Sequence, residues 1–207
     1  MNAEPYLKFL VEEIHSVIFA TIDTQGHPLT CAIDLMDHDA HGLYFLTATG
    51  KSFYHRLKRD GHIALSGMKG KDTLSCVSIS LQGQAREIGT ARLPRLFALN
   101  PYKEKIYPTE ASRRALTVFC IEQGSGEWFD LSKSPIKRAS FAFGDIAPKT
   151  SGYFVSDTCT GCGRCLPLCP QQCIDVFNDK AVIEQAHCLH CGNCMQACPF
   201  DAVTFLK

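Results

Sequence analysis

The sequence carries no excess charge of either sign, because 21 Lys and Arg residues balance 21 Asp and Glu residues in a chain of 207. A balanced chain creates no field that would attract nucleic acid or an anionic membrane surface. The sequence also has no run of the ~20 apolar residues that a membrane-spanning helix requires. We therefore expect a soluble protein with neither nucleic acid nor a membrane as its partner.

Other absences concern targeting and catalysis. The first residues, MNAEPYLKFLVEEIH, contain no basic-then-apolar leader, so we expect a cytoplasmic protein with reduced cysteines. No Ser-His-Asp or paired-carboxylate constellation is present, and no Gly-x-Gly-x-x-Gly segment would take a dinucleotide. His27, Tyr54 and His55 are either proton donors or structural residues, and no catalytic residue is assigned.

What the chain has in excess is cysteine, with 12 residues of this type. Eight of them form two Cys-x-x-Cys-x-x-Cys-x-x-x-Cys-Pro runs: Cys159, Cys162, Cys165 and Cys169, then Cys188, Cys191, Cys194 and Cys198. In such a run three thiolates hold one iron-sulfur cube, and the fourth cysteine binds the other cube. The spacing predicts one [4Fe-4S] cluster on Cys159, Cys162, Cys165 and Cys198, and a second on Cys188, Cys191, Cys194 and Cys169.

Other interpretations of these cysteines fit less well. Zinc sites use four ligands, typically in two separated pairs, and a disulfide framework belongs to short secreted chains. The two runs repeat with an offset of 29 residues, which places Cys173 opposite Ala202. Cys173 is thus expected to be a packing residue. His190 is expected to be a spacer between two ligands, the alternative being a residue that tunes the cluster potential by hydrogen bonding. The single cysteines Cys31, Cys76 and Cys120 are interpreted as core residues.

Residues 152–207 closely resemble the bacterial two-cluster ferredoxins. Their flanking segments 153–155, 174–177, 181–184 and 202–205 are typical of short β-strands. The first ~150 residues instead indicate an antiparallel β-domain, with strands expected at 17–22, 29–33, 43–46, 63–68, 77–81, 84–88, 118–122 and 128–131. Helices are expected at 6–13, 52–59 and 91–99, and residues 135–151 are interpreted as a connection. The expected domains are 1–146 and 147–207.

One segment of the β-domain suggests a phosphate site. Thr47-Ala48-Thr49-Gly50-Lys51-Ser52 ends a strand and enters a helix, so hydroxyls, a cation and a helix N-terminus lie within one turn. It is not a Walker A loop, because Phe45 stands where the first glycine belongs. The alternative is a polar turn with a solvated lysine.

The β-domain combines this order of elements with three motifs: Phe-Ala-Thr-Ile-Asp-x-x-Gly-x-Pro at 19–28, the segment at 45–54 and Gly-Gln-Ala-Arg-Glu at 83–87. In these features it resembles the pyridoxamine 5'-phosphate oxidase-like FMN-binding split β-barrel family. The resemblance covers residues 5–145 and implies a homodimer with FMN at the interface. It places the cofactor near Cys31, Ala32, Ile33, Thr47, Thr49, Lys51, Ser52, Arg86 and Trp128. Of these, Lys51 and Ser52 would hold the phosphate, and Trp128 would come from the partner subunit. Arg86 and Trp128 also fit a surface and a core position.

The expected fold is therefore mainly β (α+β), a split β-barrel FMN-binding domain followed by a small α+β two-cluster ferredoxin-like domain. The true oxidase has a C-terminal Arg-x-His segment where this chain has the ferredoxin-like module, so oxidation of pyridoxamine phosphate is not expected. The basic stretch of the branch that uses the deazaflavin F420 is also missing, which favours FMN.

The two halves together suggest an oxidoreductase. Each cluster passes one electron, whereas a flavin accepts two singly and delivers them together. We expect an external low-potential donor or acceptor, both clusters, FMN and a small organic substrate, with the direction of electron flow open. The alternatives are an electron-transfer protein without turnover of its own, and a redox-sensing or haem-binding protein.

Overall fold

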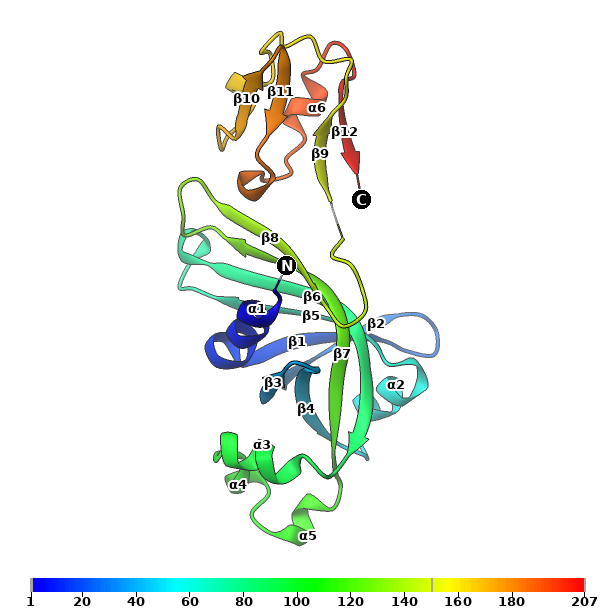
Figure 1. Cartoon of the computed structure of the whole chain (residues 1–207). Coiled ribbons are helices and arrows are strands. Elements are labelled where there is room, and N and C mark those ends of the chain that lie inside the picture. The colour runs from blue at the N-terminus through cyan, green and yellow to red at the C-terminus, as the bar shows by residue number, and fades with distance from the viewer. Residues whose placement is uncertain (1, 150, 207) are drawn as a thin grey trace. The chain divides into compact units, whose positions relative to one another are not determined.

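The computed structural model describes residues 2–149 and 151–206. These residues form two compact units (Figure 1). The first consists of the described residues up to Lys69, Ser78–Gly126 and Phe141–Pro148. The second consists of Gly70–Val77, Glu127–Ser140 and the described residues from Lys149 onward. Strands β7 (Leu116–Asp130) and β8 (Lys137–Phe143) therefore contribute residues to both units.

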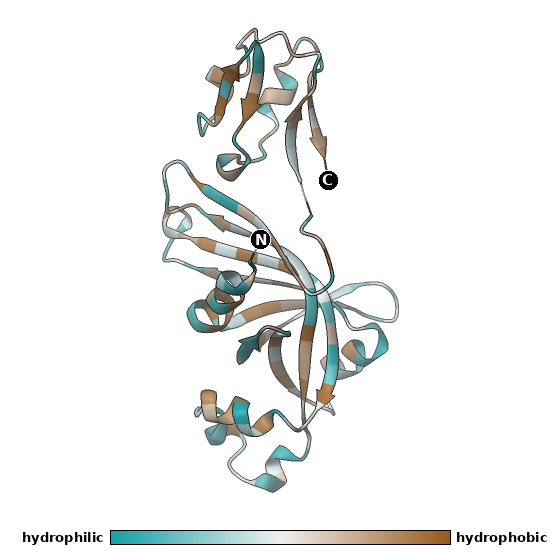
Figure 2. Cartoon of the chain, viewed as in Figure 1, coloured by the Kyte–Doolittle hydropathy of each residue, from teal (hydrophilic) through white to brown (hydrophobic). Residues whose placement is uncertain are grey.

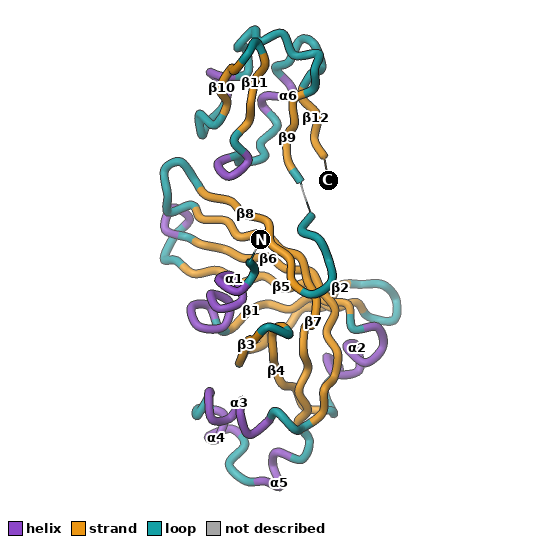
Figure 3. The backbone as a smooth tube through the Cα atoms, viewed as in Figure 1, coloured by secondary structure: helices purple, strands orange, loops and turns teal. Residues whose placement is uncertain are grey.

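One eight-stranded sheet dominates the first unit (Figure 3). Its strands run in the order β2-β1-β5-β6-β7-β4-β3, and β8 pairs with β7. The remaining bounds are β1 Ser16–Ile22, β2 Pro28–Asp34, β3 Asp37–Asp39, β4 Gly42–Ala48, β5 His62–Lys69 and β6 Val77–Gly89. The pairs β1–β2, β1–β5, β3–β4 and β4–β7 are antiparallel. The mainly β fold expected from the sequence is thus confirmed.

The core of the sheet is aromatic and aliphatic. The rings of Phe19 and Phe45 are 4.9 Å apart, and Phe45 stacks on Phe119 at 5.6 Å. Phe53 reaches the same cluster from helix α2 (Ser52–Asp60), with its ring 5.8 Å from Phe19. Strands β1 and β4 are correspondingly apolar in Figure 2. Burial of Phe53 and Leu57 therefore fixes one face of α2 against the barrel.

The other helices are short. They are α1 Glu4–Lys8, which continues into a π-helical turn at Phe9–Ile14, α3 Leu93–Leu99, α4 Lys103–Ile106 and α5 Glu110–Arg113. Helices α4 and α5 were not expected from the sequence. Within the described residues, no helix combines the length and the apolar character needed to span a bilayer.

Two strands replace four expected ones. Strands β6 and β7 continue through Gly83, Gly124 and Gly126, which lie between the separate strands that the sequence suggested. A Cβ at Gly83 would lie 2.5 Å from the Gln123 carbonyl oxygen, and one at Gly126 would lie 2.4 Å from that of Ser80. These glycines therefore allow close approach of two paired strands rather than a reversal of the chain.

Strand β8 lies inside the segment 135–151, which the sequence suggested was a connection. Its Phe141 is fully buried and stacks on Tyr6 with the ring centroids 4.6 Å apart. A short strand with a single deeply buried ring gives too little alternation to be recognised in the sequence. The connection between the sheet and β9 is correspondingly shorter than expected.

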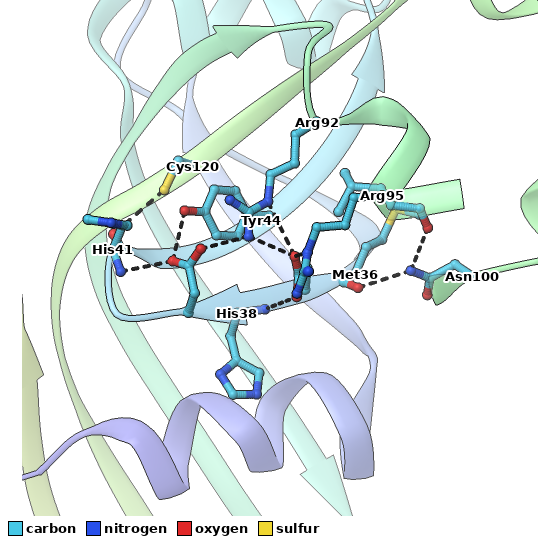
Figure 4. A network of polar contacts seen from close by, with 11 residues as sticks. Met36, His38, His41, Tyr44, Arg92, Arg95, Asn100 and Cys120 are labelled. Atoms are coloured by element: carbon cyan, nitrogen blue, oxygen red, sulfur yellow. Dashed lines mark hydrogen bonds and ion pairs between the residues drawn. The ribbon is translucent and has the colours of Figure 1, made fainter. Parts of the chain in front are cut away.

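A charged network attaches α3 to the β3–β4 hairpin (Figure 4). Arg92 donates to Asp37 at 2.8 Å and to Asp39 at 2.7 Å, and Arg95 donates to Asp37 at 2.6 Å. The Arg92 guanidinium also lies 3.5 Å from the centre of the Tyr44 ring. Burial raises the pKa of Asp37, but the bonds from Arg95 and Arg92 outweigh it and hold that pKa below its usual value. The network is therefore ionised and fixes α3 in place.

The second unit contains two small antiparallel sheets. One pairs β9 (Gly152–Val155) with β12 (Val203–Leu206), and the other pairs β10 (Ile174–Phe177) with β11 (Lys180–Ile183). Helix α6 spans Asn193–Gln196, and single 3-10 turns lie at Leu166–Leu168 and Gln185–His187. All four strands expected in this part of the chain are present.

Candidate cofactor sites

The first candidate cluster site gathers cysteines from both motifs. Burial raises the pKa of the Cys165 thiol, and the neighbouring Cys159, Cys162 and Cys198 raise it further. Gly161 and Gly163 adopt positive φ angles of 64° and 71° in the loop between the ligands. Three thiols of the first run and the last thiol of the second run thus lie together, as crossed ligation requires.

The second candidate site shows the reciprocal arrangement. Burial raises the pKa of Cys194 to about 11, and the neighbouring Cys188 and Cys191 contribute in the same direction. Cys169, from the first run, lies close enough to Cys188 to raise the pKa of that thiol as well. The fourth cysteine of each run therefore lies beside the other run. The assignment of these eight residues as ligands stays a prediction.

Backbone amides point at several of these sulfurs. The N–H groups of Ala181 and His190 donate to Cys159 and Cys188 at 3.4 Å, and that of Ala202 donates to Cys198 at 3.3 Å. Such donors stabilise thiolates and raise the reduction potential of a bound iron-sulfur cluster. The donor set and its surroundings therefore suit iron-sulfur ligation.

Cys173 lies beside a candidate ligand without belonging to either set of four. Its side chain is 7% exposed, and its Sγ lies 3.5 Å from the Sγ of Cys169. Burial and the hydrogen bond with Cys169 raise the pKa of Cys173. The repeat partner Ala202 is fully buried. The interpretation of Cys173 as a packing residue stays a prediction.

The candidate phosphate site lies where β4 passes into α2. Lys51 is the extended N-cap residue of α2, Ser52 is its first residue, and both are exposed. Partial burial raises the pKa of Cys31 on β2, whereas the nearby charges of Arg56 and Lys51 lower it. Two cations therefore converge on the part of β2 that the sequence associated with the cofactor. A dianionic phosphate fits this environment.

Arg56 was missed in the sequence analysis. Its Nε donates to Thr21 Oγ1 at 2.7 Å, and Arg59, one turn later, donates to the carbonyl oxygen of Ile22. Both arginines thereby attach α2 to the end of β1. The signal in the sequence was helical spacing, because Arg56 follows Ser52 by four residues and lies on the same face of α2.

The two threonines near the end of β4 differ in exposure. Thr47 is only 2% exposed, and its Oγ1 has no hydrogen-bond partner among the described residues. Thr49 is exposed, and its backbone N–H donates to the Ala115 carbonyl at 2.8 Å. The Thr49 side chain is thus available to a ligand at the surface, whereas the Thr47 hydroxyl is buried. Of the β2 residues, Ala32 is exposed and Ile33 half-buried.

Arg86 and Trp128 were also expected near the cofactor. Arg86 of β6 makes a two-point ion pair with Glu122 of β7, with a 2.8 Å bond from Nε. Together with Lys58 and Arg59 it lines a cavity of about 360 Å³. Trp128 is half-buried and belongs to the second unit. The roles of Arg86 and Trp128 in binding the cofactor stay predictions.

A carboxylate that lines this cavity forms polar contacts with side chains of α2 and β7. Glu87 accepts hydrogen bonds from Thr117 at 2.7 Å and Tyr54 at 3.3 Å, and Lys58 lies 2.8 Å away. Burial raises the pKa of Glu87, but the bonds from Lys58 and Thr117 keep it below its usual value. Tyr54 is thus held by an ionised acid, while His27 and His55 are exposed.

Solved structures of three proteins share the fold of the first unit. A NimC/NimA family protein from Clostridium acetobutylicum has a TM-score of 0.54 at 16% identity, covering 68% of this chain and 91% of that one. PhzG from Burkholderia lata 383, solved with tetrahydrophenazine-1-carboxylic acid, has a TM-score of 0.51 at 16% identity, covering 71% and 84%. A heme binding protein from Mycobacterium smegmatis has a TM-score of 0.52 at 14% identity, covering 68% and 58%.

Comparisons of the sequence with family models are more specific. No curated protein matches the chain significantly. A family model for the 4Fe-4S dicluster domain matches residues 158–202, which contain both cysteine runs. The model for pyridoxamine 5'-phosphate oxidase matches residues 3–126, more than half of the chain. The chain therefore belongs to the pyridoxamine 5'-phosphate oxidase family and carries a 4Fe-4S dicluster domain, a combination that gives it a redox role.

Proposed function

We propose that the protein is an iron-sulfur flavoprotein oxidoreductase that passes single electrons through two [4Fe-4S] clusters to FMN, which reduces a small organic substrate. The observation that carries this proposal is the gathering of two complete sets of thiols, each with one cysteine from the other motif. The proposed partner is an external low-potential electron donor or acceptor, and the proposed location is the cytoplasm. The proposed functional domains are residues 1–146 and 147–207.

The chain's residues would divide the work as follows. The first cluster would be held by Cys159, Cys162, Cys165 and Cys198, and the second by Cys188, Cys191, Cys194 and Cys169. Lys51, Ser52 and Arg56 would bind the FMN phosphate, while the main chain of residues 31–33 would face the flavin ring. When bound, FMN accepts electrons singly and can deliver two together as hydride.

The remaining residues of the FMN proposal would each take part in a different way. Thr49 would line the ribityl chain from the surface, and Thr47 would contribute through its backbone because its hydroxyl is buried. Arg86 would have to exchange Glu122 for the ligand. Trp128 would come from a partner subunit.

A homodimer is supported by an exposed apolar surface on β1, β2 and β5. On β1, Ile18 is 50% exposed and stands opposite Ala32 of β2. Ala20, two residues on, stands opposite Ala64 of β5, so apolar side chains of all three strands share one face. A second copy of this chain is the proposed occupant, because the face adjoins the Cys31 segment proposed to meet the cofactor.

Replacing Ile18 by glutamate is expected to convert the dimer to a monomer. Even a neutral polar group buried without a partner costs roughly 1–3 kcal/mol, a carboxylate costs more, and the change would occur twice in a twofold interface. At ~1.4 kcal/mol per tenfold, the dissociation constant should rise by about a hundredfold or more. Light scattering during gel filtration measures this directly. Val182→Glu, at an exposed position of β11, is the matched control and should remain dimeric. A dimeric Ile18→Glu variant would place the interface elsewhere.

Protein purified without oxygen is expected to contain about eight iron and about eight acid-labile sulfide per chain, because two full sets of ligands are present. FMN should be released on denaturation and identified by chromatography. An iron content near four would show that one motif is vacant. Oxidants screened against the reduced protein would then identify the substrate class.

The absorption spectrum separates this proposal from its alternatives. One neighbour of similar fold is described as a heme binding protein, and a haem in this chain would give a sharp Soret band after the clusters are bleached. FMN would give two broad bands, and F420 would be distinguished by mass. A pure electron carrier would contain FMN and both clusters yet show no turnover with any organic acceptor.

A further inference from the structure

The hairpin formed by the end of β7 and the start of β8 contacts the ferredoxin-like part of the second unit. Ile136 donates its N–H to Gln171 Oε1 at 3.0 Å, and its carbonyl oxygen lies 2.6 Å from His187 Nδ1. Arg138, two residues further on, donates to His190 Nδ1. Residues 127–140, Gln171, His187 and His190 all belong to this one compact unit.

All three contacts fall on the segments that carry the proposed ligands of the second cluster. Gln171 follows Cys169 by two residues, His187 directly precedes Cys188, and His190 lies between Cys188 and Cys191. The hairpin residues named here make no such contact with the loop of residues 159–165 among the described hydrogen bonds. The β7–β8 hairpin is therefore a support for one cluster site rather than for both.

Arg138 introduces a shielded positive charge at this point. Its side chain is 15% exposed, and its guanidinium lies 4.9 Å from the centre of the Phe129 ring. The nearest carboxylate is that of Glu127, at 3.8 Å from Nη1, a longer separation than a strong ion pair has. Its Nε is buried without a hydrogen-bond partner among the described residues. The charge is thus only partly compensated.

The corresponding position of the first loop has different surroundings. Gly161 stands where His190 stands in the repeat, and a Cβ there would lie 2.8 Å from the backbone of Asp179. The side chains near this loop include Asp157, which pairs with Lys180 at 2.6 Å. Arg164, inside the first run, is exposed, so solvent screens its charge. The two loops are therefore electrostatically unequal.

We propose that the positive charge of Arg138 raises the reduction potential of the second cluster above that of the first. The inference rests on the proposed ligand sets. Reduction adds one electron, and thus one negative charge, to a cluster, and a nearby cation in a water-poor environment stabilises the reduced form. The electron is supplied by a one-electron donor of low potential. With this order of potentials, the second cluster collects electrons from the first.

The test is a redox titration of the anaerobic protein with dithionite and mediator dyes, followed by EPR. In Arg138→Gln the higher of the two potentials should fall while the lower one stays. For unit charges roughly 10 Å apart at an effective dielectric constant of about 20, Coulomb's law gives about a tenfold change in an equilibrium constant. A tenfold change corresponds to about 59 mV for one electron. Glu127→Gln removes the counter-charge and should raise the same potential.

Two further variants keep the test decisive. Lys137→Gln removes a charge from the adjacent exposed position. It should change the equilibrium constant for reduction of either cluster by no more than about twofold. Arg138→Lys keeps the charge and should restore at least half of the shift. If Arg138→Gln does not retain the second cluster, the proposal is tested on Arg138→Lys, which is expected to keep its full iron content. Unchanged potentials in a variant with full iron would overturn the proposal, whereas a parent protein with four iron would instead refute the ligand sets.

Discussion

Replacing Cys169 by alanine is expected to remove the second cluster, although Cys169 belongs to the first cysteine run. The thiol lies beside Cys188, and a [4Fe-4S] cluster that loses one of four cysteine ligands is not stably held. Iron and sulfide should fall by about half, to about four of each per chain. EPR of the reduced variant should lose the spin coupling between two neighbouring clusters and retain the signal of the first.

Cys173→Ala is the matched control for this experiment. Its sulfur lies only 3.5 Å from that of Cys169, so both substitutions remove a thiol from nearly the same place. Because Cys173 is expected to be a packing residue, the iron content and EPR signals of the Cys173→Ala variant should equal those of the parent. Loss of iron in the Cys173 variant would make Cys173 a ligand. Selective loss of the first cluster in the Cys169 variant would contradict crossed ligation.

The ferredoxin-like part could be predicted closely from the sequence. The ligand spacing is a local property, and an iron-sulfur cube constrains how a loop of residues 159–165 must fold. The four flanking strands follow from short apolar segments that are bounded by turns. The position of Cys169 near Cys188 could also be anticipated, because in such paired runs the fourth cysteine serves the other cluster.

The β-domain was predicted in outline and wrong in detail at its glycines. Gly83 and Gly126 lie between segments that the sequence suggested were separate strands, but each lies within one long strand whose neighbour comes too close for a side chain. Such an approach is a property of the pairing of β6 with β7, not of either segment alone. Strand β8 was missed for a related reason, since its Phe141 is buried by contact with the distant Tyr6.

Arg56 and Arg138 show what lies beyond sequence patterns. An arginine on an amphipathic helix and an arginine on a short strand both resemble ordinary surface residues. Their significance depends on contacts with Thr21 and His190, which are 35 and 52 residues away in the sequence. Contacts between residues so far apart in the sequence can be identified only from the tertiary structure. The position of Lys51 could be predicted, because the strand, the Gly-Lys-Ser turn and the helix follow one another directly.

Lys51→Ala is expected to weaken the binding of FMN without preventing it. FMN ends in a phosphate, which suits the N-terminus of α2 and the cations Lys51 and Arg56 near Cys31. Removing one charge-assisted contact costs roughly 1.5–3 kcal/mol. At ~1.4 kcal/mol per tenfold, the dissociation constant should rise by about one to two orders of magnitude. Arg56 remains in the variant, and for this reason binding should persist.

Two comparisons make this measurement specific to the phosphate. Riboflavin has no phosphate, so its affinity should be the same for the Lys51→Ala variant and the parent. Lys105→Ala, at an exposed position of α4, removes an equal charge elsewhere and should leave FMN binding unchanged. Fluorescence titration of the flavin-free protein gives all five dissociation constants. If Lys51→Ala binds FMN as tightly as the parent does, the phosphate lies elsewhere, and the cavity lined by Lys58, Arg59 and Arg86 becomes the next site to test, because it holds three further cations.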